Sequence, residues 1–493
     1  MVKKLLFFLL IPIIGIGQVQ IGQDIVGVAL DDFCGYSVAL SSYGNIVAVG
    51  APSNDGTGTD SGHVRIYEEI SGDWTQIGQD IEGESAGDQN GFSIALSSFG
   101  NIVAIGAPFN DGNGNNSGSV RVYEFDMGVW KQLGHDIDGK SAEEQSGFSI
   151  SLSSNGRILA IGAPYKAWKG DALNPSGTVR VYGYSNISGV WTQIGNDIDG
   201  QGWQYYSGTS ISISSDGSIL AIGTIFESGT GVVRVYKNVS GVWTQIGNTI
   251  HGEGNSDRFG RNLSISADGS VLAVAGYLND EKGLNAGHVR VYRNVSSVWT
   301  QIGDDIYGEV ALENAGFDVS LSADGTTVAV GAFLSNSNGT RSGTTRIYEN
   351  ILGSWTKKVN DIKGKASYER IGYSVSLSAD GGRVAIGAPE LPVGFPPMPI
   401  GNGLARVYDL TTSSTNNFIK NNFNVYPNPA TDILNIGLEN NLVLEKVTIY
   451  NNLGQVVKIS KDAVVNVENM VSGVYFVEVI TNQGKATKKV IKK

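Results

Sequence analysis

The stretch that decides the fold is Gly91-Phe-Ser-Ile-Ala-Leu-Ser97, followed by Ile102-Val-Ala-Ile-Gly-Ala107, Val120-Arg-Val-Tyr-Glu124 and Trp130-Lys-Gln-Leu133. The first segment alternates polar and apolar residues, which is typical of a half-buried strand. The second is a continuous apolar run, as expected for a strand covered on both faces. Short turns and one Gly/Asn-rich loop separate the four segments. The stretch therefore predicts a four-stranded antiparallel meander.

The same pattern recurs along most of the chain, in steps of 52 to 61 residues. A unit of this kind cannot bury its own apolar faces and must stack on its neighbours. Its tryptophan marks six of the units, and the motif Arg-[Val/Ile]-Tyr marks seven. The tryptophans are Trp74, Trp130, Trp191, Trp243, Trp299 and Trp355. The arginines of the motif are Arg65, Arg121, Arg180, Arg234, Arg290, Arg346 and Arg406.

Counting the units predicts a closed ring. Residues 18–410 span 393 positions, which is close to seven units of 56. Val19-Gln-Ile-Gly22 resembles the fourth strand of a unit, whereas the last unit ends after its third strand at Tyr408. We therefore expect an all-β, seven-bladed β-propeller of four-stranded antiparallel blades, in which the N-terminal strand completes the seventh blade.

The residues that recur in every unit are expected to serve packing. We predict that Tyr67 lies opposite Trp74 across a hairpin, since aromatic pairs of this kind stabilise antiparallel strands. The recurrent aspartates are expected to fix loops as hydrogen-bond acceptors. They are Asp24, Asp80, Asp136, Asp197, Asp305 and Asp361.

Composition and the N-terminal segment limit the classes of binding partner and the cellular compartment that we expect. The net charge of −12 argues against nucleic acid as a partner. Residues 1–17 are typical of a secretory signal peptide, with Lys3 and Lys4 before an apolar run and cleavage expected between Gly17 and Gln18. No other stretch is apolar enough to span a membrane, so the mature chain is expected to be soluble and exported. The single cysteine, Cys34, is expected to pack as a small buried side chain.

Two segments of the first unit, Gly-Tyr-Ser-Val-Ala-Leu (35–40) and Val-Ala-Val-Gly-Ala-Pro (47–52), resemble FG-GAP repeats. Such repeats form the seven-bladed propeller of integrin α subunits and of many bacterial surface proteins. The chain departs from that pattern because a literal Phe-Gly occurs only at Phe259-Gly260. Its turns between the first two strands also carry too few oxygens to cage calcium. We expect no cofactor and no metal ligands, with calcium in the longer Asp/Asn loops as the alternative.

The C-terminal segment resembles the sorting domain of the type IX secretion system of Bacteroidota. The resemblance rests on Val425-Tyr-Pro-Asn-Pro-Ala-Thr-Asp432, on Val447-Thr-Ile-Tyr-Asn-Asn-Leu-Gly-Gln-Val456 and on Gly473-Val-Tyr-Phe-Val-Glu478. It implies a small β-sandwich over residues 421–493 that binds the secretion machinery and directs export to the cell surface or the medium. A polar linker is expected over residues 411–420, after the propeller of residues 18–410.

Ligand specificity should lie where the units differ. The connections from strand two to three and from strand four to one emerge on the same face of a propeller. In the third and fourth units these loops are rich in aromatic and lysine residues, which are typical anchors for sugars or proteins. Residues 389–401 add a Pro-rich loop on the same face. The candidate ligand-binding residues are Tyr165, Lys166, Trp168, Lys169, Trp203, Tyr205 and Tyr206.

No motif points to catalysis. Metalloprotease, nucleophile-elbow, phosphate-loop and zinc-finger spacings are absent from the sequence. His63 and His288 occupy equivalent positions and are expected to be structural. The sequence thus favours a secreted or cell-surface, non-enzymatic binding or adhesion protein that recognises extracellular protein or glycan. The alternatives are a structural surface component, or a polysaccharide-degrading hydrolase or lyase that uses loop carboxylates such as Glu143 with Glu144, or Asp280 with Glu281.

Overall fold

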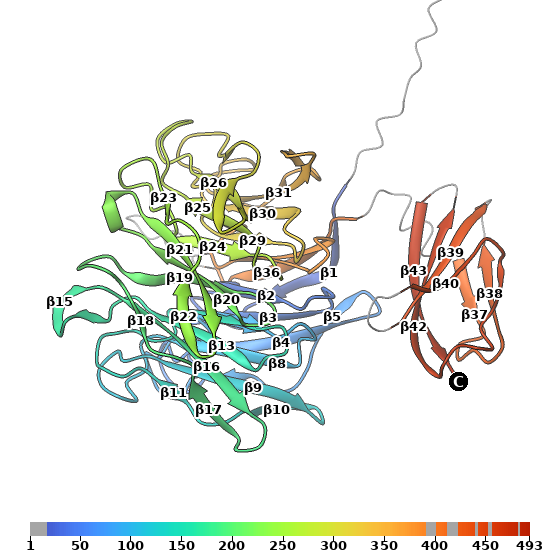
Figure 1. The fold of residues 1–493 in the computed structure, drawn as a ribbon, viewed down its shortest axis with the longest axis horizontal. Coiled ribbons are helices and arrows are strands. Elements are labelled where there is room, and N and C mark those ends of the chain that lie inside the picture. Colours follow the sequence, from blue (N-terminus) through green and yellow to red (C-terminus); the bar gives the residue numbers. More distant parts are fainter. Residues whose placement is uncertain (1–16, 391–400, 412–422, 439–441, 452–455, 482–483) are drawn as a thin grey trace, which may run out of the picture. The chain divides into compact units, whose positions relative to one another are not determined.

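The computed structural model describes residues 17–390, 401–411, 423–438, 442–451, 456–481 and 484–493. Over these residues the regular secondary structure is almost entirely β-strand, with one short 3-10 helix, η1 (Glu227–Gly229). The larger compact unit spans Gln20–Leu410, and the smaller includes the described residues from Thr411 to Lys493. Figure 1 shows the strands of the larger unit in blue to orange and those of the smaller in red. In the described part of the chain, no helix has the length and apolar character needed to cross a membrane.

Six sheets of the larger unit share one plan, a meander of four antiparallel strands plus a two-residue extension. The first strand of each sheet is followed by a tight turn, and the second is buried along most of its length because sheets cover it on both faces. In the first sheet the strands are β2 (Ser37–Leu40), β3 (Ile46–Ala51), β4 (His63–Ile70), β5 (Asp73–Gln76) and β6 (Ile81–Glu82).

The next five sheets repeat this plan in chain order. The second has β7 (Ser93–Leu96), β8 (Ile102–Ala107), β9 (Ser119–Asp126), β10 (Val129–Gln132) and β11 (Ile137–Asp138). The third has β12 (Ser149–Leu152), β13 (Ile158–Ala163), β16 (Thr178–Ser185), β17 (Val190–Gln193) and β18 (Ile198–Asp199), with a separate hairpin of β14 (Ala167–Trp168) and β15 (Asp171–Pro175). The fourth has β19 (Ser207–Ile213), β20 (Ile219–Thr224), β21 (Val232–Val239), β22 (Val242–Gln245) and β23 (Ile250–His251). The fifth has β24 (Asn262–Ile265), β25 (Val271–Gly276), β26 (His288–Val295), β27 (Val298–Gln301) and β28 (Ile306–Tyr307). The sixth has β29 (Val319–Leu321), β30 (Thr327–Ala332), β31 (Thr344–Ile351), β32 (Ser354–Lys357) and β33 (Ile362–Lys363).

The seventh sheet joins the two ends of the larger unit. Its order is β1 (Val19–Val26), β36 (Leu404–Asp409), β35 (Arg383–Ala388) and β34 (Ser374–Leu377). Asp24 of β1 accepts hydrogen bonds from Nε and Nη2 of Arg406 at 2.9 and 2.8 Å. The arginine holds the pKa of Asp24 near 2, against the opposing effect of burial. The fold is the seven-bladed propeller that the repeat predicts.

The predicted register of one hairpin is wrong, although Tyr67 packs against the buried cluster that contains Trp74. The hairpin register sets Tyr67 opposite Gln76 and Trp74 opposite Glu69. A two-residue turn after Ile70, which pairs with Asp73, fixes this register, so Tyr67 and Trp74 are not cross-strand partners.

The tryptophans instead join neighbouring blades. Each indole N–H donates to a backbone carbonyl of the preceding blade, so the repeated Trp closes an inter-blade seam. The bonds run from Trp74 to Ile21 (2.9 Å), Trp130 to Ile77 (2.9 Å), Trp191 to Leu133 (2.7 Å), Trp243 to Ile194 (3.0 Å), Trp299 to Ile246 (3.2 Å) and Trp355 to Ile302 (2.8 Å).

The core is built between blades rather than within them. One cluster joins Ala48, Val64 and Ile66 of the first sheet to Val103 and Ile105 of the second, with Trp130 also buried there. Because each sheet supplies only half of such a cluster, the blades depend on one another for burial of their apolar area. The recurrent arginines each lie within 4 Å of a carboxylate. The pairs are Arg65–Asp80, Arg121–Glu84, Arg180–Glu144, Arg234–Glu227, Arg290–Asp305, Arg346–Glu313 and Arg406–Glu369.

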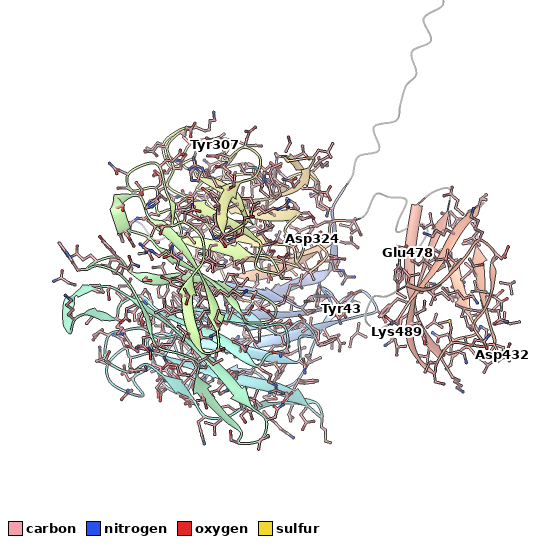
Figure 2. All side chains as sticks on the ribbon, viewed as in Figure 1. Tyr43, Tyr307, Asp324, Asp432, Glu478 and Lys489 are labelled. Carbon is pink, nitrogen blue, oxygen red and sulfur yellow. The ribbon has the colours of Figure 1, made fainter. Side chains whose placement is uncertain are left out.

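The smaller unit is a β-sandwich. One sheet holds β37 (Phe423–Tyr426), β38 (Ile433–Leu438) and β41 (Val464–Asn466), and the other holds β40 (Val456–Ser460), β39 (Leu444–Tyr450), β42 (Gly473–Thr481) and β43 (Gly484–Lys492). Phe423 and Leu434 of the first sheet share one buried cluster with Val447, Val477 and Val490 of the second. Asp432, Glu478 and Lys489 mark this unit in Figure 2.

Candidate functional site

The first strands of the seven blades surround a central channel of about 390 Å³. A glycine lies at or just before the start of each of these strands, at the end where the longer connections lie, so the channel opens on that face. We call it the loop face. The opposite end carries the tight turns, and Figure 2 labels Tyr43 and Asp324 in two of them. A volume of this size is within the range of small-ligand sites, about 300–1,000 Å³.

The longer connections of the loop face are packed over their own blades. Thr57 Oγ1 donates to the carbonyl of Gly83 at 2.6 Å, and Asn113 Nδ2 donates to that of Gly139 at 2.8 Å. The carboxylate of Asp55 accepts the amide N–H of Asp60 at 2.9 Å. Thr57 and Asn113 thus hold their loops against the following connection, whereas Asp55 fixes the shape of its own loop.

Aromatic rings stand at the mouth of the channel, at the position directly after the strand-one glycine. Five of the seven positions are aromatic, and the rings touch in an unbroken row. The centroids are 4.8 Å apart for Phe317 and Tyr373, 5.1 Å for Tyr373 and Tyr36, 5.1 Å for Tyr36 and Phe92, and 5.0 Å for Phe92 and Phe148. Burial raises the pKa of both Tyr36 and Tyr373, so their hydroxyls are protonated at neutral pH.

The predicted loop aromatics continue this row. Tyr165 lies 6.1 Å from Phe148 and 5.3 Å from Tyr206, centroid to centroid, and Tyr206 lies 5.3 Å from Phe226. Loops from the third and fourth blades therefore meet, as their place in the repeat predicts. We call the whole set the aromatic arc: Phe317, Tyr373, Tyr36, Phe92, Phe148, Tyr165, Tyr206 and Phe226.

The other predicted residues have different surroundings. Trp203 is 59% exposed, and the ring of Tyr205 lies against Gly202. Lys166 forms ion pairs with Asp197 at 3.2 Å and Asp199 at 2.7 Å, so its charge is already neutralised. Lys169 is exposed.

Three predictions concern residues that the structure describes only in part or that begin the described range. The side chain of Trp168 lies outside them, as do residues 391–400 of the Pro-rich loop. Gly17 and Gln18 are the first described residues, and cleavage between them stays a prediction.

The sequence analysis did not identify the blades that depart from the repeated motif at the channel mouth. Four blades read Gly-[Tyr/Phe]-Ser at the mouth, but the fourth, fifth and sixth read Gly208-Thr-Ser, Gly260-Arg-Asn and Gly316-Phe-Asp. Arg261 and Asp318 thereby line the channel. Comparing the repeats at this one position would have found them, because a departure from sevenfold packing needs another explanation.

Asp318 occupies the position at which five other blades have a serine that is hydrogen-bonded to the next blade. In five blades this serine donates to the glycine carbonyl of the next blade, as Ser37 does to Gly91 at 2.7 Å. The Asp318 carboxylate instead accepts the amides of Val375 at 2.7 Å and Val319 at 2.9 Å. Burial raises the pKa of Asp318 to about 7, although these amides and Arg261 act in the opposite direction.

One group of side chains has the composition of a metal site. Ligand atoms of His63, Asp80 and Glu82 lie within 4.8 Å of one another. Burial lowers the pKa of His63 to about 4, so its imidazole is neutral at pH 7. However, Arg65 already donates to Asp80 at 2.5 Å and supplies the positive charge there. The equivalent histidine of the fifth blade, His288, likewise lies 3.6 Å from Asp305, which pairs with Arg290.

The carboxylates weighed for hydrolysis have local partners. Glu144 is buried and pairs with Arg180 at 2.6 Å, while Glu143 accepts a hydrogen bond from Asn115. Asp280 accepts the amide of Asn285, and Glu281 accepts the hydroxyl of Tyr307 at 2.6 Å. Burial raises the pKa of Cys34 to about 12, so this thiol is protonated at neutral pH.

Comparison with known proteins identifies the smaller unit. Residues 424–493 match the family model of the secretion system C-terminal sorting domain. A search of curated proteins found no match. The chain is exported by the type IX secretion system to the cell surface or the extracellular space.

Three solved structures are similar to the chain at low sequence identity. The WD40 repeats of RRP9 are 10% identical, with a TM-score of 0.48, over 79% of this chain and 99% of that one. The U3-55K structure is 10% identical, with a TM-score of 0.48, over 78% and 98%. A candidate 6-phosphogluconolactonase from Bacteroides uniformis is 13% identical, with a TM-score of 0.48, over 69% and 88%. The order of the seven sheets and the sorting-domain match together define the chain as an exported β-propeller with a type IX sorting domain.

Proposed function

We propose that this chain is a non-enzymatic binding protein of the cell surface or extracellular space, with a propeller of the FG-GAP, integrin-α-like type. Its ligand is an extracellular glycan or protein, held at the loop face. The observation that carries the proposal is the aromatic arc, in which rings from separate blades and loops meet around the channel mouth. Aromatic anchors of this kind bury large apolar area and are common in recognition sites.

The test is binding of the purified chain to arrays of glycans and extracellular-matrix proteins. A double variant, Tyr165→Ala with Tyr206→Ala, removes two rings at the centre of the arc. We expect it to weaken binding at least tenfold, since anchor residues at interfaces contribute about 2 kcal/mol or more. The matched control is Tyr43→Ala with Phe99→Ala, which removes a contacting aromatic pair (5.9 Å) from the turn face.

The outcomes separate the candidate functions. Loss of binding in the arc variant alone supports the proposal. Equal loss in both variants would place the site elsewhere. Products released from a polysaccharide by the purified chain would indicate a hydrolase or lyase, and absence of both binding and turnover would favour a structural surface component.

A further inference from the structure

Positive charge is left unpaired on one part of the loop face. The seven arginines of the repeat motif each contact a carboxylate. Arg258, Arg261 and Arg370 form no ion pair with any described residue, although the chain has 47 acidic residues and 35 Lys and Arg. In so acidic a protein, unpaired arginines beside a channel need an explanation other than a shortage of partners.

Arg261 reaches into the centre of the mouth. It comes from the fifth blade, yet its guanidinium carbon lies 5.9 Å from the ring centroid of Phe148 in the third. Its charge also acts on Tyr36 of the first blade, Tyr373 of the seventh and Asp318 of the sixth. A group with these neighbours stands across the channel axis, where a ligand entering from the loop face would meet it.

The two other arginines lie beside the arc. The guanidinium of Arg258 stacks on Phe226 at 3.7 Å from the ring centroid. Arg370 is 3% exposed, and its Nε and Nη2 have no hydrogen-bond acceptor among the described residues. Its charge acts on Tyr373 at the mouth. A buried guanidinium without an acceptor is costly, and an incoming anion would offset that cost.

Asp318, the one acid among the described residues that line the channel, does not neutralise Arg261. Asp318 lines the same channel, but its carboxylate is held by two backbone amides and is not within ion-pair distance of that arginine. The mouth therefore combines an unpaired planar cation with an arc of aromatic faces. A guanidinium recognises carboxylates through paired N–H donors.

We infer that the channel mouth binds a carboxylated sugar, the uronate unit of an acidic polysaccharide, with Arg261 on its carboxylate and the aromatic arc against its sugar rings. This inference rests on the proposed function. The ligand class follows from the pairing of rings with a cation, because aromatic faces receive the apolar faces of sugars. The channel volume suits one or a few sugar units rather than a protein surface.

The test is calorimetric titration of the full chain with short oligogalacturonates, and with the same oligosaccharides after reduction of their carboxyl groups to alcohols. We expect the native chain to bind the acidic probe at least tenfold more tightly, with affinity falling as salt is raised. Arg261→Gln should remove this preference, because a hydrogen bond to a charged group contributes about 1.5–3 kcal/mol, or roughly 10- to 140-fold. Lys237→Gln is the control, since it removes one equal charge from an exposed position on β21.

Each remaining outcome is decisive. Equal binding of acidic and reduced probes, or an Arg261→Gln variant that keeps the preference, overturns the inference while leaving a glycan-binding protein. Binding only to peptides with a free carboxylate also overturns it. Binding to no probe and to no array member counts against the proposed function itself. If Arg261→Gln lacks a thermal unfolding transition, the inference is tested by measuring the preference for the acidic over the reduced probe in the native chain and in Arg261→Lys.

Discussion

Single residues matter most where the sevenfold pattern is broken. Four blades place a serine directly after the mouth aromatic, and Asp318 follows Phe317 in the sixth blade. A carboxylate cannot donate a hydrogen bond to the next blade unless it is protonated. The sixth blade therefore lacks the serine hydrogen bond to its neighbour and has a titratable group in the channel instead. Arg261 and Asp318 together give the channel a chemistry that the repeat alone would not have.

The Asp318 position gives a prediction on pH. Burial raises its pKa to about 7, whereas an unfolded chain has a value of about 3.9. Between these values the native state binds a proton that the unfolded state does not, so the free energy of unfolding falls as pH rises. Asp318→Ser should therefore be more stable than the native chain at pH 8 by on the order of 4 kcal/mol, with a smaller difference at pH 5. Urea unfolding at both pH values measures this; a difference independent of pH would contradict it.

At six of the seven seams, neighbouring blades are joined by a glycine and a tryptophan. After its fourth strand, the chain of a blade leaves the sheet and then pairs with the third strand again through the two-residue extension. In the first blade, Gly78 lies between the fourth strand, β5, and this extension, β6. Gly78 has a left-handed φ of 73°, and a Cβ there would lie 2.6 Å from Trp130 of the next blade. The Trp and Gly of the repeat are thus two halves of one inter-blade contact.

Gly78→Ala should accordingly destabilise the propeller by more than its backbone strain alone. The left-handed conformation costs an alanine about 1 kcal/mol, and the displaced indole adds the loss of packing and of its hydrogen bond. Gly72→Ala is the matched control, because Gly72 has φ 95° but no atom within 4 Å of the added carbon. Thermal unfolding of the two variants compares them; equal shifts would show that the Trp130 contact contributes nothing.

At the scale of the whole molecule, closure of the ring depends on β1. This strand completes the seventh sheet and carries Asp24, which pairs with Arg406. Removing residues 18–26 would expose the edge of β36 and break this pair. We expect the truncated chain to unfold at lower temperature and to associate with itself, as measured by calorimetry and light scattering. An unchanged transition would show that the ring is held by the other six seams.

The sorting domain gives a separate prediction on export. A chain that ends at Leu410 lacks the unit matched by the sorting-domain family but keeps all seven propeller sheets. We expect its propeller to fold, by circular dichroism, while the protein stays inside the outer membrane in cell fractionation. Surface display of the truncated chain would contradict this.

The sequence by itself determined the number of blades, the order of strands within each, the phase that sends β1 to β36, and the sorting domain. These follow from local periodicity and turn residues, which act within a few residues of the chain. The sequence also predicted that Tyr165 and Tyr206 lie on the loop face, because the positions of the loops follow from the repeat.

Only the tertiary structure decided what meets across the seams and the channel. The partner of Trp74 is the backbone of Ile21 rather than Tyr67, Lys166 is neutralised by Asp197 and Asp199, and Arg261 reaches Phe148 two blades away. Such contacts join residues far apart in the chain, and their geometry depends on how seven sheets close around an axis. No pattern within one repeat records that closure, which is why the unpaired arginines of the mouth became visible only in the folded chain.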